Sequence, residues 1–199
     1  MGTARSVTAE PPGPGGSSSR FADFVRQNTP SLFATARLLT GNRDAAEDLL
    51  QEVLTRLLPR WDRVIAADNP LAYVRRAVVN AFISSTRRAA NGEVVADSDT
   101  LAALMSGTHE IGDHADSVAT AVTIAPLLAG LGSRQRAALV LRYFHGSTDA
   151  EIAESLGCRR GTARSLISRG LEILRRDLGS ERADSAPRTD PTNARGADR

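Results

Sequence analysis

The chain has 199 residues, a formal net charge of +2 and one cysteine, Cys158. This length suits one or two small domains, and a single cysteine excludes a framework of intramolecular disulfides. No apolar run approaches the roughly 18–20 residues of a membrane span, and the N-terminus lacks the hydrophobic core of a signal peptide. We therefore expect a soluble, cytoplasmic protein with no membrane insertion.

The two ends of the chain differ in composition from its middle. Residues 1–19 are rich in Pro, Gly and Ser, and residues 179–199 are mostly polar without periodicity, so we expect both to be disordered tails. The remainder carries apolar residues at helical spacing and lacks the alternation typical of strands. The sequence therefore predicts an all-α protein.

The first helical domain is expected within residues 20–88. Its three helical stretches are expected over residues 21–39, 44–59 and 69–88. Pro30 should interrupt the first stretch, because an interior proline removes a helical hydrogen bond. The third stretch should begin at Asn69-Pro70, because proline is tolerated in the first turn of a helix.

The composition changes after this domain. Residues 89–116 hold six acids and no arginine, which predicts a flexible acidic linker. Helical periodicity resumes near Val118 and continues to residue 178. The sequence thus predicts two small helical domains, residues 20–88 and 117–178, joined by this linker.

The most informative motif lies in residues 148–176, which have the pattern of a helix-turn-helix. Ile152 and Leu156 mark the inner face of a first helix, and Gly157 suits the turn because glycine accepts a positive φ. Six arginines and one acid lie between residues 155 and 176, so the outer face of the second helix is basic. Such a helix fits the major groove of DNA. The alternative is an ordinary helical hairpin with a solvated basic face.

No residue pattern indicates catalysis or metal binding. His109, His114 and His145 form no convincing ligand set with Cys158. The sequence also lacks a nucleophile–base pair and a phosphate-binding loop. We therefore expect no metal, no cofactor and no enzymatic activity.

Further motifs accompany the helix-turn-helix in a specific order. Residues 131–146 read LGSRQRAALVLRYFHG and resemble sigma region 4, whereas residues 38–54, LLTGNRDAAEDLLQEVL, and 69–80, NPLAYVRRAVVN, resemble sigma region 2. Over residues 21–178 the chain resembles an extracytoplasmic-function sigma factor of the sigma-70 family, in the style of the actinobacterial SigE-like group. Gly170 departs from the pattern, because the family often has alanine there.

The resemblance implies that the protein binds core RNA polymerase, through the β′ clamp helices and the β flap, and promoter DNA. It would recognise the minus-thirty-five and minus-ten elements and support promoter opening and transcription initiation. The residues implied for core polymerase are Asp44, Glu47, Asp48, Gln51, Glu52 and Thr55. Those implied for the minus-ten element are Trp61, Arg63, Asn69, Tyr73, Arg75, Arg76, Asn80, Arg87 and Arg88. Those implied for the minus-thirty-five element are Arg134, Arg136, Thr148, Arg159, Arg160, Thr162, Arg164, Ser165, Ser168 and Arg169.

Each of these assignments has an alternative. The acidic second helix suits a solvated surface, Trp61 and Tyr73 suit core packing, and the linker suits a plain tether as well as a nucleic-acid mimic in the RNA-exit path. A helix-turn-helix repressor would not need residues 44–54 and 69–80, and a pure interaction protein would not need two basic surfaces. The resemblance also implies an anti-sigma factor as a partner. The sequence does not identify that factor, the promoter or the inducing signal.

Overall fold

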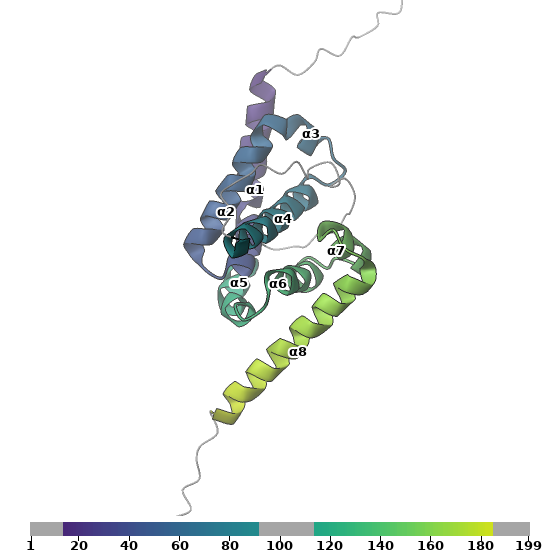
Figure 1. Ribbon diagram of the computed structural model, residues 1–199. Helices are drawn as coiled ribbons and strands as arrows, with labels where there is room; N and C mark the ends of the chain where they lie inside the picture. Colours follow the sequence, from purple (N-terminus) through teal and green to yellow (C-terminus); the bar gives the residue numbers. More distant parts are fainter. Residues whose placement is uncertain (1–13, 92–113, 185–199) are drawn as a thin grey trace, which may run out of the picture.

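The computed structural model of the protein describes residues 14–91 and 114–184 (Figure 1). In chain order the elements are α1 (Pro14–Thr40), α2 (Arg43–Leu57), η1 (Leu58–Arg60), α3 (Trp61–Ile65), α4 (Pro70–Asn91), α5 (His114–Leu128), α6 (Ser133–Leu139), the π-helical turn η3 (Val140–Phe144), α7 (Asp149–Ser155) and α8 (Arg160–Asp184). No strand occurs in the two described ranges. The predicted all-α class is confirmed.

The first helix differs from the prediction at two points. It begins at Pro14, inside the expected N-terminal tail, and it continues through Pro30 without interruption. Two side chains donate to carbonyls in the turn before the proline. Asn28 Nδ2 donates to Phe24 O at 2.8 Å, and Thr29 Oγ1 donates to Val25 O at 2.6 Å.

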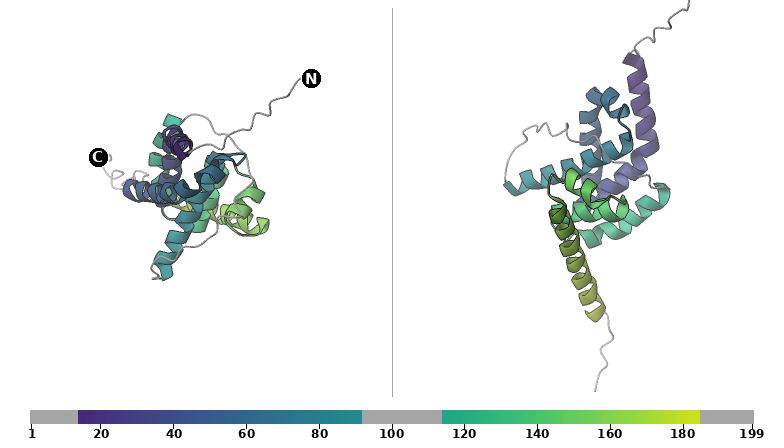
Figure 2. Two further views of the ribbon diagram at one scale, coloured as in Figure 1. Left: turned by 90° about the horizontal axis from the view of Figure 1, so that it is seen from above. Right: turned by 90° about the vertical axis from the view of Figure 1, so that its right-hand side faces the viewer.

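The last helix also exceeds its predicted bound. α8 extends to Asp184, past residue 178, where a disordered tail was expected. Its C-terminal half projects away from the rest of the molecule in both figures (Figures 1 and 2). Residues 175–180 of this helix are all exposed, so this part has no buried face to impose an apolar periodicity.

The helices α1, α2, α3 and α4 form the first helical unit around an aromatic cluster. Trp61 is 1% exposed, and its ring centroid lies 5.1 Å from that of Phe21 and 4.8 Å from that of Phe24. Asparagines cap two of the helices, because Asn42 Oδ1 accepts from Ala45 N at 2.8 Å and Asn69 Oδ1 accepts from Ala72 N at 2.9 Å.

The helix-turn-helix forms as the sequence predicts. Ile152 of α7 and Ala163 of α8 are fully buried where the two helices pack together. Gly157 ends the first helix at φ 56°, a conformation that a side chain disfavours. The turn is closed by Arg134, whose Nη2 donates to Leu156 O at 2.7 Å.

The two helical units pack against each other. Helix α5 lies along α1, and α6 contacts α4. Thr35 Oγ1 is 3.1 Å from His145 Nε2, and Arg76 Nη2 is 2.9 Å from Glu154 Oε1. The predicted acidic linker lies outside the described residues except for its ends, since residues 89–91 finish α4 and residues 114–116 begin α5.

Gly170 marks a close approach of α8 to α6. It is buried, and a Cβ atom at this position would lie 2.9 Å from Leu139 Cδ1 and 3.3 Å from Leu139 Cγ. Because Leu139 is itself 4% exposed, its side chain has little room to withdraw. The absence of a side chain at position 170 therefore has a packing reason.

We expect Gly170→Ala to lower the free energy of unfolding by about 1 kcal/mol, because overpacking costs roughly 1–3 kcal/mol and exceeds the helix-propensity gain of about 1 kcal/mol. Gly179→Ala is the matched control on the same helix, since nothing lies within 4 Å of its Cβ position. That variant should be at least as stable as the wild type. Urea denaturation measures both variants, and a stabilising effect of Gly170→Ala would contradict the expectation.

Candidate nucleic-acid interface

The first turns of α8 present the basic face that the sequence predicts. Ala163 and Ile167 are buried against the rest of the helix-turn-helix. The predicted DNA-facing residues of this segment are all exposed: Arg159, Arg160, Thr162, Arg164, Ser165, Ser168 and Arg169. The first turn of α8 contains no acid. The geometry thus combines an anchored helix with an outward row of hydrogen-bond donors.

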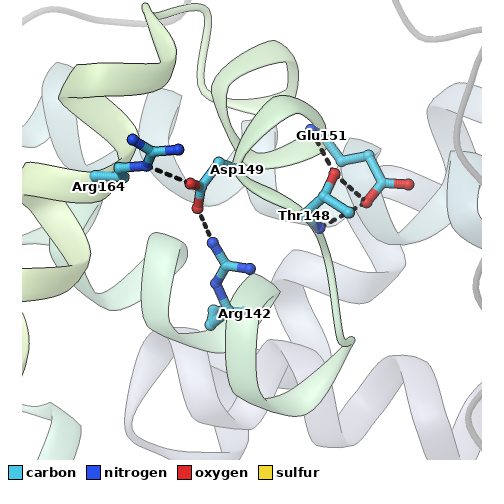
Figure 3. Close-up of polar contacts among 5 residues, drawn as sticks. All are labelled: Arg142, Thr148, Asp149, Glu151 and Arg164. Carbon is cyan, nitrogen blue, oxygen red and sulfur yellow. Dashed lines mark hydrogen bonds and ion pairs between the residues drawn. The ribbon is translucent and has the colours of Figure 1, made fainter.

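A carboxylate that the sequence analysis did not single out lies beside this face. Asp149, at the start of α7, forms an ion pair with Arg142 Nη2 and accepts a hydrogen bond from Arg164 Nε at 2.6 Å (Figure 3). Asp149 was detectable as an acid that directly follows a threonine before an apolar helical run, a pattern typical of a helix N-terminus. Its pairing with Arg164 was not, because the two residues belong to different helices.

Thr148 has a capping role in the structure. Its Oγ1 accepts from Glu151 N at 3.3 Å and donates to Glu151 Oε2 at 2.8 Å (Figure 3). The same carboxylate oxygen accepts from Thr148 N at 2.7 Å, which completes a reciprocal capping box. The side chain proposed for phosphate binding therefore starts α7.

Arg136, which was expected to hold a phosphate, binds backbone carbonyls in the structure. Its Nη1 donates to Leu39 O at 2.6 Å, and its Nη2 donates to Ala129 O at 2.7 Å. Its guanidinium lies 5.8 Å from the ring centroid of Phe82, and burial lowers its pKa. Because backbone carbonyls accept from both terminal nitrogens, Arg136 joins the two helical units in this arrangement, and its phosphate role stays a prediction.

Arg75 and Arg76 of α4 were expected on a DNA-facing surface, and both are buried. Arg75 is 5% exposed and donates from Nη2 to Ser31 Oγ at 2.9 Å, and desolvation lowers its pKa. Arg76 is 7% exposed and pairs with Glu154 of α7. The second helical unit therefore covers the part of α4 to which these arginines belong.

The other residues predicted for the minus-ten element include buried, half-buried and exposed side chains. Trp61 and Tyr73 are buried, so core packing is what the structure shows for both, and burial raises the pKa of Tyr73 against an opposing effect of Arg60. Asn69 caps α4, and Asn80 is half-buried. Arg63 and Arg87 are exposed, whereas Arg88 is half-buried at 3.9 Å from Glu52.

The outer side of α2 carries the predicted acidic face. Its exposed members are Asp44, Glu47, Asp48, Gln51 and Thr55, and Glu52 is half-buried. Glu47 Oε1 accepts from Arg43 Nε at 2.8 Å, and Glu52 pairs with Arg56 at 2.5 Å. The buried side of the same helix packs Leu49, Leu50 and Val53 into the core.

His145 is a buried titratable group between the two helical units. Desolvation, with a further contribution from Arg75, lowers its pKa to about 3. Its Nδ1 has no hydrogen-bond partner among the described residues. This role could not be predicted from local sequence, because the ring contacts Thr35, which lies 110 positions earlier in the chain.

Within residues 14–91 and 114–184, no three His, Cys, Asp or Glu side chains lie close enough together to hold a metal ion. In the same part of the chain, no helix has the length and apolar character needed to cross a membrane.

The chain matches two protein families in the order that its motifs indicate. Residues 24–92 match the model of sigma-70 region 2, and residues 123–174 match that of sigma-70 region 4. The RNA polymerase sigma-E factor of Streptomyces avermitilis is 32% identical over 167 residues, which cover 83% of this chain and 88% of that protein. The ECF RNA polymerase sigma factor SigL of Mycobacterium tuberculosis is 31% identical over 74% of this chain and 82% of its own length.

Solved structures share the fold. The sigma factor RpoE, in complex with the anti-sigma factor NepR from Bartonella quintana, superimposes with a TM-score of 0.55 at 23% identity, over 81% of this chain and 98% of that one. CnrH in complex with the cytosolic domain of CnrY gives a TM-score of 0.53 at 18% identity, over 84% of this chain and 92% of that one.

Proposed function

The chain belongs to the extracytoplasmic-function group of sigma-70 RNA polymerase sigma factors, and we propose which of its surfaces perform the steps of transcription initiation. Membership implies a non-enzymatic protein that binds core RNA polymerase and promoter DNA. The described residues offer one acidic face, on α2, and one exposed basic face, on the first turns of α8. These two faces carry the proposal.

The acidic face of α2 is proposed to bind the β′ clamp helices of core polymerase. Its carboxylates stand on a helix whose opposite side is locked in the core, so they are held in a fixed arrangement. Such an arrangement supports electrostatic complementarity with a basic partner. The second helical unit, which contains the helix-turn-helix, is proposed to contact the β flap.

The exposed face of α8 is proposed to read the minus-thirty-five element in the major groove. The observation that carries this assignment is the separation of its faces, with Ala163 and Ile167 buried and Arg160 and Arg164 exposed near the N-terminal end of the helix. That end of a recognition helix contacts base edges in helix-turn-helix proteins.

The minus-ten element is proposed to bind α4 and the segment before it, with Arg63 and Arg87 as exposed phosphate ligands. Arg75 and Arg76 are covered by the second helical unit in the arrangement described here. A role for them in DNA binding therefore requires the two units to separate. An anti-sigma factor is proposed as a further partner, because the solved relatives RpoE and CnrH were determined with NepR and with the cytosolic domain of CnrY.

The test of this proposal is base preference. We expect Ala at Arg160 or at Arg164 to relax the preference at one minus-thirty-five position, because a bidentate arginine–base contact supplies roughly 1–3 kcal/mol of discrimination. Reconstituted holoenzyme should be assayed by transcription from a promoter library randomised in this element, at two salt concentrations. Arg175→Ala, an exposed change further along α8, is the control and should leave the preferences unchanged. Unaltered preferences in both test variants would exclude this helix as the reader.

A further inference from the structure

Asp149 links three elements of the helix-turn-helix unit through one carboxylate. Its Oδ1 pairs with Arg142 of η3, and its Oδ2 accepts from Arg164 Nε at 2.6 Å (Figure 3). The Asp149 side chain is 22% exposed, whereas that of Arg164 is 75% exposed. The carboxylate is therefore fixed from the protein side by Arg142, while the arginine that it holds reaches into solvent.

Because Asp149 binds Arg164 through Nε, the donors of Arg164 that remain for DNA are those on its terminal nitrogens. A guanidinium has five N–H donors in a rigid planar fork, one on Nε and two on each terminal nitrogen. Asp149 takes the donor on Nε, and Figure 3 draws no contact from either terminal nitrogen of Arg164 to the other residues shown. An arginine can contact guanine O6 and N7 either with both terminal nitrogens or with Nε and one of them. The pairing removes the second of these modes.

We propose that Asp149 is a positioning residue that restricts Arg164 to end-on reading of a guanine in the minus-thirty-five element. This inference rests on the proposed reading role of α8. Holding the side chain also removes, before DNA binds, rotamer freedom that contact with a base would otherwise restrict. The guanine is the partner of choice because its O6 and N7 match two parallel donors.

The carboxylate has a second, opposite effect on DNA binding. A negative charge beside the basic face repels every phosphate, whatever the base sequence. Removing it should therefore strengthen general binding to DNA while it weakens discrimination at one base. A residue that merely stabilised the fold would lower both together.

The experiment uses reconstituted holoenzyme and transcription from the promoter library randomised in the minus-thirty-five element. Its variants are Asp149→Asn, Arg164→Ala and the double variant. We expect Asp149→Asn to reduce the preference for guanine at the Arg164-dependent position by about fivefold. Transcription from promoters that lack this guanine should be unchanged or increased. In the Arg164→Ala background, Asp149→Asn should cause no further loss of preference, because its effect is transmitted through Arg164.

A matched control distinguishes the loss of a negative charge in general from the loss of the Asp149 contact with Arg164. Glu172→Gln removes one exposed acid from α8, two turns beyond Arg164, and should leave the base preferences as they are in the wild type. If Arg164→Ala removes the base preference at one promoter position and Asp149→Asn does not, the positioning role of Asp149 is wrong and the reading role of Arg164 stands. If Arg164→Ala itself changes no preference, the reading role fails first. A fall in transcription caused by Asp149→Asn in the Arg164→Ala background would show a structural role and overturn the proposal.

Discussion

Changing two acids of α2 should weaken association with core RNA polymerase at least tenfold, which corresponds to about 1.4 kcal/mol. The variant is Asp48→Arg combined with Glu52→Gln. Asp48 is exposed, so its reversal introduces repulsion toward a basic partner without disturbing the core. Glu52 is changed to Gln because it pairs with Arg56 and lies 3.9 Å from Arg88, where a third arginine would destabilise the fold. Binding to immobilised core polymerase measures the effect, and circular dichroism should show unchanged helical content.

The control carries the same change in charge on other surfaces. Asp23→Arg combined with Glu172→Gln alters two exposed acids of α1 and α8, and it should bind core polymerase as the wild type does. The difference between the two double variants should shrink as salt rises, because exposed charges are screened beyond about 10 Å at 0.1 M ionic strength. Equal binding by both variants would mean that α2 does not carry the docking surface.

The parts of the fold that local chemistry determines could be predicted from the sequence. The helical periodicity, the start of α4 at Asn69-Pro70 and the turn at Gly157 each depend on residues within a few positions of one another. The separation of buried and exposed faces on the first turns of α8 follows from the same local spacing. These features can therefore be predicted from the sequence alone.

The arginines show why other parts of the site could not be predicted. Three arginines resemble phosphate ligands in the sequence, because no acid is adjacent to them: Arg75, Arg76 and Arg136. Their partners come from distant segments, such as Glu154, which lies 78 positions after Arg76, and the carbonyl of Leu39, which lies 97 positions before Arg136. A surface and a buried arginine have the same local sequence, and only the packing of the two helical units distinguishes them.

The contact between the two helical units contains a histidine that must stay neutral. Thr35 has one hydroxyl proton, which it donates to Ser31 O at 2.9 Å. His145 Nε2 therefore donates to Thr35 Oγ1, and the unprotonated Nδ1 is buried without a partner among the described residues. Protonation of Nδ1 would place a charge in this site, close to Arg75, and this explains why the pKa of His145 is lowered to about 3.

Linkage makes this contact sensitive to acid. When the units separate or unfold, the pKa of His145 returns toward its ordinary 6.5, so the open state binds a proton that the closed state rejects. Above pH 6.5 both states are neutral and the closed arrangement keeps its full stability. As the pH falls from 6.5 toward 3, the open state gains about 1.4 kcal/mol per pH unit. At pH 5 the loss should be about 2 kcal/mol.

The comparison of wild type with His145→Gln isolates this effect. Glutamine can still donate to Thr35 Oγ1 and does not titrate, while every other titratable group remains in both proteins. Urea unfolding at pH 7.5 and pH 5 should show the wild type losing about 2 kcal/mol more than the variant. Small-angle X-ray scattering should show the wild type expanding at a higher pH than the variant does. Parallel pH profiles would mean that the ring titrates without opening the contact, and the buried histidine would then not link acidity to the separation that exposes Arg75 and Arg76.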